Sequence, residues 1–174
     1  MIISVEDLRK HIDTTLDDSV LGAKLQALEL LIRKHTNNNF QNRGIRLQCP
    51  IMATKLYLTT PFLKVGDTIQ ISESIYSDGI YVIKEVEESF VVLDKPLFDE
   101  AGVLVTKVEY PMDVVFGAIN MMKWDLENRD KVGIQSETIS RHSVTYFNMD
   151  GDNSSMGYPK SLLGFLVPYR KARF

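Results

Sequence analysis

The sequence predicts an α+β protein in which an antiparallel β-barrel-like domain (45–110) is inserted into a small helical domain (1–44 and 111–174). Apolar residues recur at helical spacing through residue 40, alternate within the insertion, and return to helical spacing after Pro111. Charge changes in the same region, because residues 64–110 carry ten acidic and four basic residues, a net −6, against −3 for the whole chain. The chain then ends in a basic segment after Pro168, which we expect to be an extended C-terminal tail.

The composition is that of an ordinary globular protein. The chain has 174 residues, of which 44% are hydrophobic and 25% charged, enough for one domain or two small ones with real cores. Lys and Arg total 20 against 23 Asp and Glu, which argues against a protein that grips nucleic acid over its whole surface. Cys49 is the one cysteine, so an intrachain disulfide and a multi-cysteine zinc site are excluded.

Two helices are predicted before residue 40. Ser4 and Asp7 have the spacing of a capping box, which indicates a short helix over about 5–12. Thr15 or Asp17 can cap a second, longer helix that runs to about residue 36 and ends at the amide-rich turn 37–39. Its apolar stripe consists of Leu21, Leu25, Leu28, Ile32 and His35.

The inserted domain reads as a series of short strands separated by Gly and Asp turns. This pattern is typical of a small antiparallel barrel, either OB-like or SH3-like. Loops at 40–46 and near 110 are expected to bound the domain. The expected strands cover 54–59, 67–71, 80–86, 89–93 and 103–109.

A third helix is predicted over about 111–129, because Pro suits the first helical turn. Its core face should consist of Val115, Ile119, Met122 and Leu126, whereas Trp124 lies off this stripe, as an interface or a rim residue. Residues 134–147 then alternate as strands do, with a break near 140–142.

The C-terminal part begins with a polar loop at 150–157. Pro159 is expected to start a short helix through Leu166, and Pro168 to end it. The tail, residues 169–174, has two aromatic residues flanking three cations. It reads either as a docking arm for a partner or as a frayed chain end, and we favour docking because Phe174 is an unusual last residue for a solvated tail.

No catalytic or cofactor motif stands out. His11, His35 and His142 are far apart in the sequence, and phosphate-binding glycine loops are missing. The acidic loop at 150–153 resembles the start of a calcium-binding loop but lacks the required Gly and the bidentate Glu. We therefore expect a protein that is not an enzyme and that needs no cofactor or metal.

The chain is also expected to be soluble and made inside the cell. It contains no apolar run long enough to span a membrane, and its first residues lack the basic start and apolar stretch of a signal peptide. We accordingly expect no membrane partner.

Three stretches, in this order, resemble one protein family. They are LQALELLIRKHTNNNF (25–40), LENRDKVGIQSETISRHSVTY (126–146) and PKSLLGFLVPYRKARF (159–174). Together they resemble the head–tail connector, or head completion, proteins of long-tailed bacteriophages and prophages. The resemblance covers the helical domain and does not extend to the insertion at 45–110.

The resemblance implies a structural adaptor rather than an enzyme. Such a protein forms a homo-oligomeric ring, a dodecamer, beneath the portal protein, and the tail or a stopper (head-closure) protein attaches below. DNA passes through the channel without specific binding. The implied location is the head–tail interface of the virion, after synthesis in the cytoplasm of the bacterial host.

On this interpretation, two segments carry the contacts. The tail would dock on the portal, with cations for acidic partner groups and Phe174 as the apolar anchor: Tyr169, Arg170, Lys171, Arg173 and Phe174. The segment 134–147 would make subunit contacts or line the channel, through Ile134, Ser136, Glu137, Val144 and Tyr146.

Two alternatives remain open. The barrel could bind nucleic acid through its aromatic residues Tyr57, Tyr76, Tyr81 and Phe90, although the −6 charge of this region would repel phosphates. A small enzyme with an unrecognised site would rest only on the carboxylates Glu85, Glu87 and Glu88, which are more simply a solvated strand end.

Overall fold

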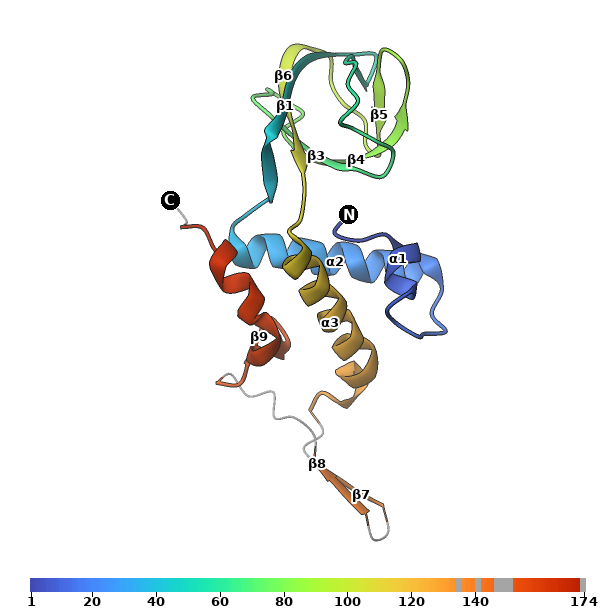
Figure 1. Ribbon diagram of the computed structural model, residues 1–174, viewed down its shortest axis with the longest axis vertical. Coiled ribbons are helices and arrows are strands. Elements are labelled where there is room, and N and C mark those ends of the chain that lie inside the picture. The colour runs from blue at the N-terminus through green and yellow to red at the C-terminus, as the bar shows by residue number, and fades with distance from the viewer. Residues whose placement is uncertain (134–135, 140–141, 146–151, 173–174) are drawn as a thin grey trace. The chain divides into compact units, whose positions relative to one another are not determined.

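The computed structural model describes residues 1–133, 136–139, 142–145 and 152–172. The chain divides into two compact units (Figure 1). The barrel unit comprises Met1 and Asn38–Tyr110, and the helical unit comprises Ile2–Asn37 and Pro111–Phe174. The protein thus combines helix and sheet, as the sequence predicts.

Helix α1 (Val5–Arg9) opens the helical unit with the expected cap. The Ser4 hydroxyl accepts from the Asp7 amide at 3.0 Å and donates to the Asp7 carboxylate at 2.7 Å. The helix is shorter than predicted, because the amides of Lys10 and His11 bond to carbonyls three residues back, at 3.1 and 2.9 Å. This tighter turn ends the α-helical pattern.

Helix α2 (Asp18–Thr36) matches its prediction closely. Its predicted leucine and isoleucine stripe is buried, and His35 is half-buried at the end of the stripe. Asn37 caps the helix with a left-handed backbone (φ 49°), and its amide bonds to the Arg33 carbonyl. A short amide side chain tolerates this conformation, which explains why the helix stops there.

Helix α3 (Met112–Asn128), followed by the 3₁₀ turn η1 (Arg129–Lys131), buries a different face from the one predicted. Ile119 and Met122 are buried as expected, but Val115 and Leu126 are only half-buried. The stripe is displaced because α3 packs against both α2 and the C-terminal 3₁₀ helix η2 (Lys160–Tyr169). The buried set is Val114, Gly117, Ala118, Ile119, Met121, Met122 and Asp125.

The C-terminal part contains more structure than the sequence indicates. Strand β9 (Ser154–Ser155), within the predicted polar loop, pairs with β10 (Tyr158–Pro159), which follows that loop. Element η2 (Lys160–Tyr169) is a 3₁₀ helix that continues through Pro168, so the prediction that this proline ends the helix is wrong. Proline lacks only its own N–H, and the Arg170 amide still bonds to the Val167 carbonyl at 3.3 Å beyond it.

The barrel unit is a closed antiparallel barrel of six strands in the order β1-β2-β5-β4-β3-β6 (Figure 1). Its core is an apolar cluster that includes Cys49, Leu56, Ile69, Ile83 and Val105. The barrel itself is therefore as predicted. The strands are β1 (Gln41–Met52), β2 (Lys55–Leu56), β3 (Thr68–Ser72), β4 (Gly79–Val86), β5 (Val91–Leu93) and β6 (Glu100–Val108).

Two predictions for this unit, one of a loop and one of a strand, are wrong. The loop expected at 40–46 is instead the start of β1, which pairs with β6 from Gln41 opposite Val108 onward, with an irregular register before Arg46. The strand expected at 54–59 shrinks to β2, because Ala53 (φ 48°) and Thr54 (φ 63°) form a left-handed turn.

The described part of the alternating segment 134–147 consists of two paired strands. Strand β7 (Ser136–Ile139) pairs with β8 (His142–Thr145), with Ser136 opposite Thr145 and Ile139 opposite His142. These two strands form a sheet of their own. Of the predicted break near 140–142, His142 belongs to β8, and residues 140–141 lie outside the described residues.

Candidate partner-binding site

The C-terminal segment is held against the end of α2 by backbone contacts. The Lys171 amide donates to the Thr36 carbonyl at 2.8 Å, and the Asn37 side-chain amide donates to the Ala172 carbonyl at 2.8 Å. The last carbonyls of a helix lack intrahelical partners, so an extended strand can bond there. The described part of the predicted tail is therefore fixed to the helical unit up to Ala172.

Tyr169 fastens the same segment to α3. Its hydroxyl lies 2.8 Å from both carboxylate oxygens of Asp113, in the first turn of that helix. This hydrogen bond raises the pKa of the Tyr169 phenol, so the hydroxyl stays protonated and keeps donating at neutral pH. Tyr169 thus joins the end of η2 to the start of α3.

The predicted docking residues differ in their accessibility. Arg170 and Lys171 are exposed and Tyr169 is half-buried, whereas Arg173 and Phe174 lie outside the described residues. Sequence reasoning missed Asp113, Thr36 and Asn37 as partners of this segment. The sequence did contain one signal, the amide-rich turn 37–39 at the end of α2. A helix end of this kind leaves hydrogen-bonding groups available to another segment.

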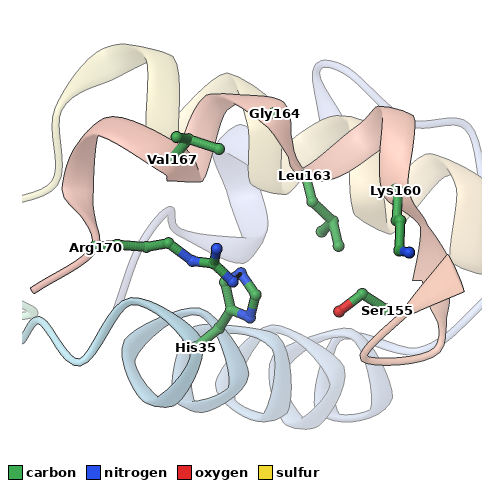
Figure 2. A pocket seen from close by; sticks show the side chains of 7 residues that line it. All are labelled: His35, Ser155, Lys160, Leu163, Gly164, Val167 and Arg170. Carbon is green, nitrogen blue, oxygen red and sulfur yellow. Dashed lines mark hydrogen bonds between the residues drawn. The ribbon is translucent and has the colours of Figure 1, made fainter. Parts of the chain in front are cut away.

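A pocket of about 260 Å³ lies beside Arg170 (Figure 2). The Arg170 side chain points toward His35, and its Nη2 lies 2.9 Å from the His35 Nε2. Arginine is always a donor, so this nitrogen of His35 is the acceptor. The lining is His35, Ser155, Lys160, Leu163, Gly164, Val167 and Arg170, from α2, β9, η2 and the residue after η2.

The second predicted contact segment supplies unpaired strand edges. Glu137 of β7 is opposite Val144 of β8, and Ser136 is opposite Thr145. Ile134 and Tyr146 lie outside the described residues. Within the described ranges, β7 and β8 pair only with each other, so each has an outer edge with unbonded backbone groups.

An ionic cluster around the buried Asp125 in the helical unit is structural. Asp125 accepts from Lys24 Nζ at 2.8 Å and from Arg129 Nε at 2.6 Å. Burial opposes the charged form of Asp125, but these two cations outweigh it and lower its pKa. The Arg129 guanidinium also lies 5.3 Å from the Trp124 ring centroid and 4.8 Å from that of Tyr158.

This cluster accounts for the position of Trp124, for which the sequence left two roles open, an interface residue or a rim residue. Its ring packs at 5.5 Å from that of Tyr158, which follows the segment predicted as a polar loop. The tryptophan is half-buried within the helical unit. It therefore stabilises the return of the chain onto α3.

Among the described residues, no group of three or more His, Cys, Asp or Glu side chains is arranged to hold a metal ion. Burial raises the pKa of the Cys49 thiol to about 11, so it is not a reactive thiolate at neutral pH. Glu85, Glu87 and Glu88 are exposed. None of the helices in the described ranges is long and apolar enough to cross a membrane.

The four aromatic residues of the alternative nucleic-acid hypothesis are not arranged as one surface for stacking bases. Tyr81 is buried in the barrel core, so its face is not available to a base. Tyr57 and Phe90 pair with ring centroids 6.0 Å apart, whereas Tyr76 pairs with Phe98 instead, at 5.9 Å. A continuous stacking platform requires successive exposed rings, which this arrangement does not provide.

Comparison with known proteins gives no family assignment. No protein-family model matches the chain, and a search of curated proteins found no significant match.

Proposed function

We propose that this protein is a non-enzymatic head–tail connector of a bacteriophage or prophage virion. In this role it forms a homo-oligomeric ring, a dodecamer, between the portal protein and the tail or stopper protein. The ring extends the channel through which DNA passes without specific binding. The proposal starts from the ordered resemblance of 25–40, 126–146 and 159–174 to that family.

The observation that carries the proposal furthest is that β7 and β8, within the residues that the structure describes, pair only with each other. A two-stranded sheet is only marginally stable by itself in water, so its open edges favour a third strand from elsewhere. In a ring, each subunit can offer such an edge to the next one through a heterologous interface. Ser136, Glu137 and Val144 in these strands are therefore proposed for subunit contact or channel lining.

The C-terminal segment is proposed as the portal-docking element. Its backbone is anchored through Lys171 and Ala172, while the side chains of Arg170 and Lys171 are exposed. An anchored segment loses less conformational entropy on binding than a free one does. The cations would then meet acidic groups of the portal, with Phe174 as the apolar anchor.

The docking role is tested with a variant that ends at Ala172. This truncation keeps the contacts of Tyr169, Arg170, Lys171 and Ala172 with the helical unit, so we expect an unchanged circular dichroism spectrum and melting curve. We expect that portal-bearing heads supplied with this variant fail to join tails. Head completion at the efficiency of the full chain would show that Arg173 and Phe174 are not needed for docking.

A further inference from the structure

The pocket beside Arg170 has a basic wall. Its titratable lining residues are His35, Lys160 and Arg170, and none of the seven lining residues is acidic. Figure 2 shows the Lys160 side chain and the Ser155 hydroxyl on the side of the pocket opposite Arg170. Donors thus flank the pocket from both sides.

The two permanent cations are held by neutral acceptors rather than by carboxylates. Lys160 Nζ donates to the Asp152 carbonyl at 2.7 Å, and Arg170 contacts the His35 ring. Within the part of the chain that the structure describes, neither Lys160 nor Arg170 forms an ion pair. An ammonium has three N–H donors and a guanidinium five, so both retain donors for an anion.

The remaining wall is apolar and open. Leu163 and Val167 come from η2, and a Cβ atom added to Gly164 between them would meet no atom within 4 Å. The volume of about 260 Å³ is smaller than that of a typical small-molecule site, about 300–1,000 Å³. The pocket therefore suits one acidic side chain with an apolar neighbour.

We propose that this pocket binds a glutamate or aspartate side chain from an acidic segment of a partner protein. Lys160 and Arg170 donate to the carboxylate, and the strip of Leu163 and Val167 contacts the adjacent apolar residue. The inference names the partner chemistry of the proposed docking site and so rests on the proposed function. A nucleic-acid phosphate is disfavoured, since a bounded pocket does not follow a phosphate backbone and the chain carries a net −3.

The test is an NMR titration of the ¹⁵N-labelled full-length chain with a blocked peptide, acetyl-Ala-Leu-Glu-Leu-Ala-amide. We expect saturable shifts of the Leu163, Gly164 and Val167 amides, and at least tenfold weaker binding of the same peptide with Gln in place of Glu. Hydrogen bonds to charged groups are stronger than those between neutral groups, so the loss of one weakens binding measurably. Lys160→Gln and Arg170→Gln should therefore each weaken binding about tenfold.

The matched control is Lys123→Gln on α3, which removes an exposed cation of the same unit that does not line the pocket. Its affinity should stay within about twofold of that of the unmodified chain. Gly164→Leu, which fills the open space beside the strip, should abolish the shifts. Equal binding of the Glu and Gln peptides, or an equal loss of affinity in Lys123→Gln, would overturn the proposal.

A thymidine oligonucleotide forms the second arm of the experiment. Shifts of the same amides that saturate with the oligonucleotide and not with the peptide would assign the pocket to phosphate and overturn the carboxylate proposal. Failure of the connector role is seen separately, as heads that gain tails without this protein. Peptide binding in that case would leave the pocket as an acidic-peptide site in another assembly.

Discussion

Gly117 lies on the side of α3 that packs against η2, and a Cβ atom added to it would overlap the ring of Phe165. The small residue lets the two helices approach closely. It also explains why the buried face of α3 includes Gly117 and Ala118, which an apolar stripe of large residues does not reveal. A single missing methyl group thus determines how this pair of elements packs.

Gly117→Ala should destabilise the helical unit. Overpacking costs about 1–3 kcal/mol, and the better helix propensity of Ala returns about 1 kcal/mol. The matched control is Gly22→Ala in α2, where the new Cβ would make an ordinary 3.8 Å contact with Val5 and should stabilise the fold. Urea unfolding of both variants provides the measurement.

Adding Phe165→Leu to Gly117→Ala should recover part of the loss, because the smaller side chain makes room for the methyl group. If the Gly117→Ala and Gly22→Ala variants had the same free energy of unfolding, this would contradict the close approach of α3 and η2.

At the scale of elements, Asp125 joins α3 to α2 through Lys24 and to η1 through Arg129. Its side chain is only 8% exposed, so its charge depends on these two partners. Tyr158 adds a hydrogen bond to the same carboxylate at 3.3 Å. The cluster therefore connects four segments of the helical unit.

Asp125→Asn should lower the free energy of unfolding by about 1–3 kcal/mol, because the half-buried Lys24 and Arg129 lose the charged acceptor that the buried carboxylate provides. The pH dependence has a definite sign. The pKa of Asp125 is lowered in the folded state, so its contribution is full above the unfolded-state value of about 3.9. It is lost as the pH falls through the lower folded-state pKa.

Thermal melts from pH 7 to pH 2 measure this effect. The stability difference between Asp125→Asn and the unmodified chain should shrink toward the acid end. Glu127→Gln on the same helix, where the side chain is exposed, should behave like the unmodified chain. A constant difference at all pH values would contradict the role of the carboxylate charge.

Local patterns in the sequence predicted the elements whose stabilisation is local. The stripe of α2 was predictable because a single face is buried, and the Ser4 cap because its partner is three residues away. The first residues of β1 were not predictable, because Gln41 and Asn42 are polar. They belong to a strand only because β1 pairs with β6, which lies far along the chain. Val115 was misassigned because α3 has neighbours on two sides.

The candidate site could be predicted only in part for the same reason. The sequence marked 169–174 as a distinct basic segment. It did not show that Lys171 bonds to Thr36 or that Arg170 meets His35, since these partners lie more than a hundred residues apart in the chain. The pocket likewise combines residues from α2, β9 and η2, and no local pattern brings them together.

At the scale of the whole molecule, the first and last residues of the barrel segment lie next to each other. The Glu109 amide donates to the Phe40 carbonyl at 2.9 Å, and the rings of Phe40 and Tyr110 have centroids 4.8 Å apart. The barrel has its own apolar core. A segment with adjacent ends and its own core can be inserted or removed without extending the chain on either side.

We therefore expect the two units to fold independently. A fragment of residues 38–110 should give a dispersed NMR spectrum and a cooperative melt. A chain in which four glycines replace 41–108 should keep the circular dichroism of a helical unit. An unfolded product in either case would show that the barrel is not a self-sufficient insertion.

The central claim is that this protein forms the layer between portal and tail. Electron cryomicroscopy of particles assembled with and without it tests that claim most directly. We predict a ring of density below the portal in complete particles, and its loss, together with loss of the tail, in particles lacking the protein. Tailed particles with unchanged density in its absence would contradict the assignment.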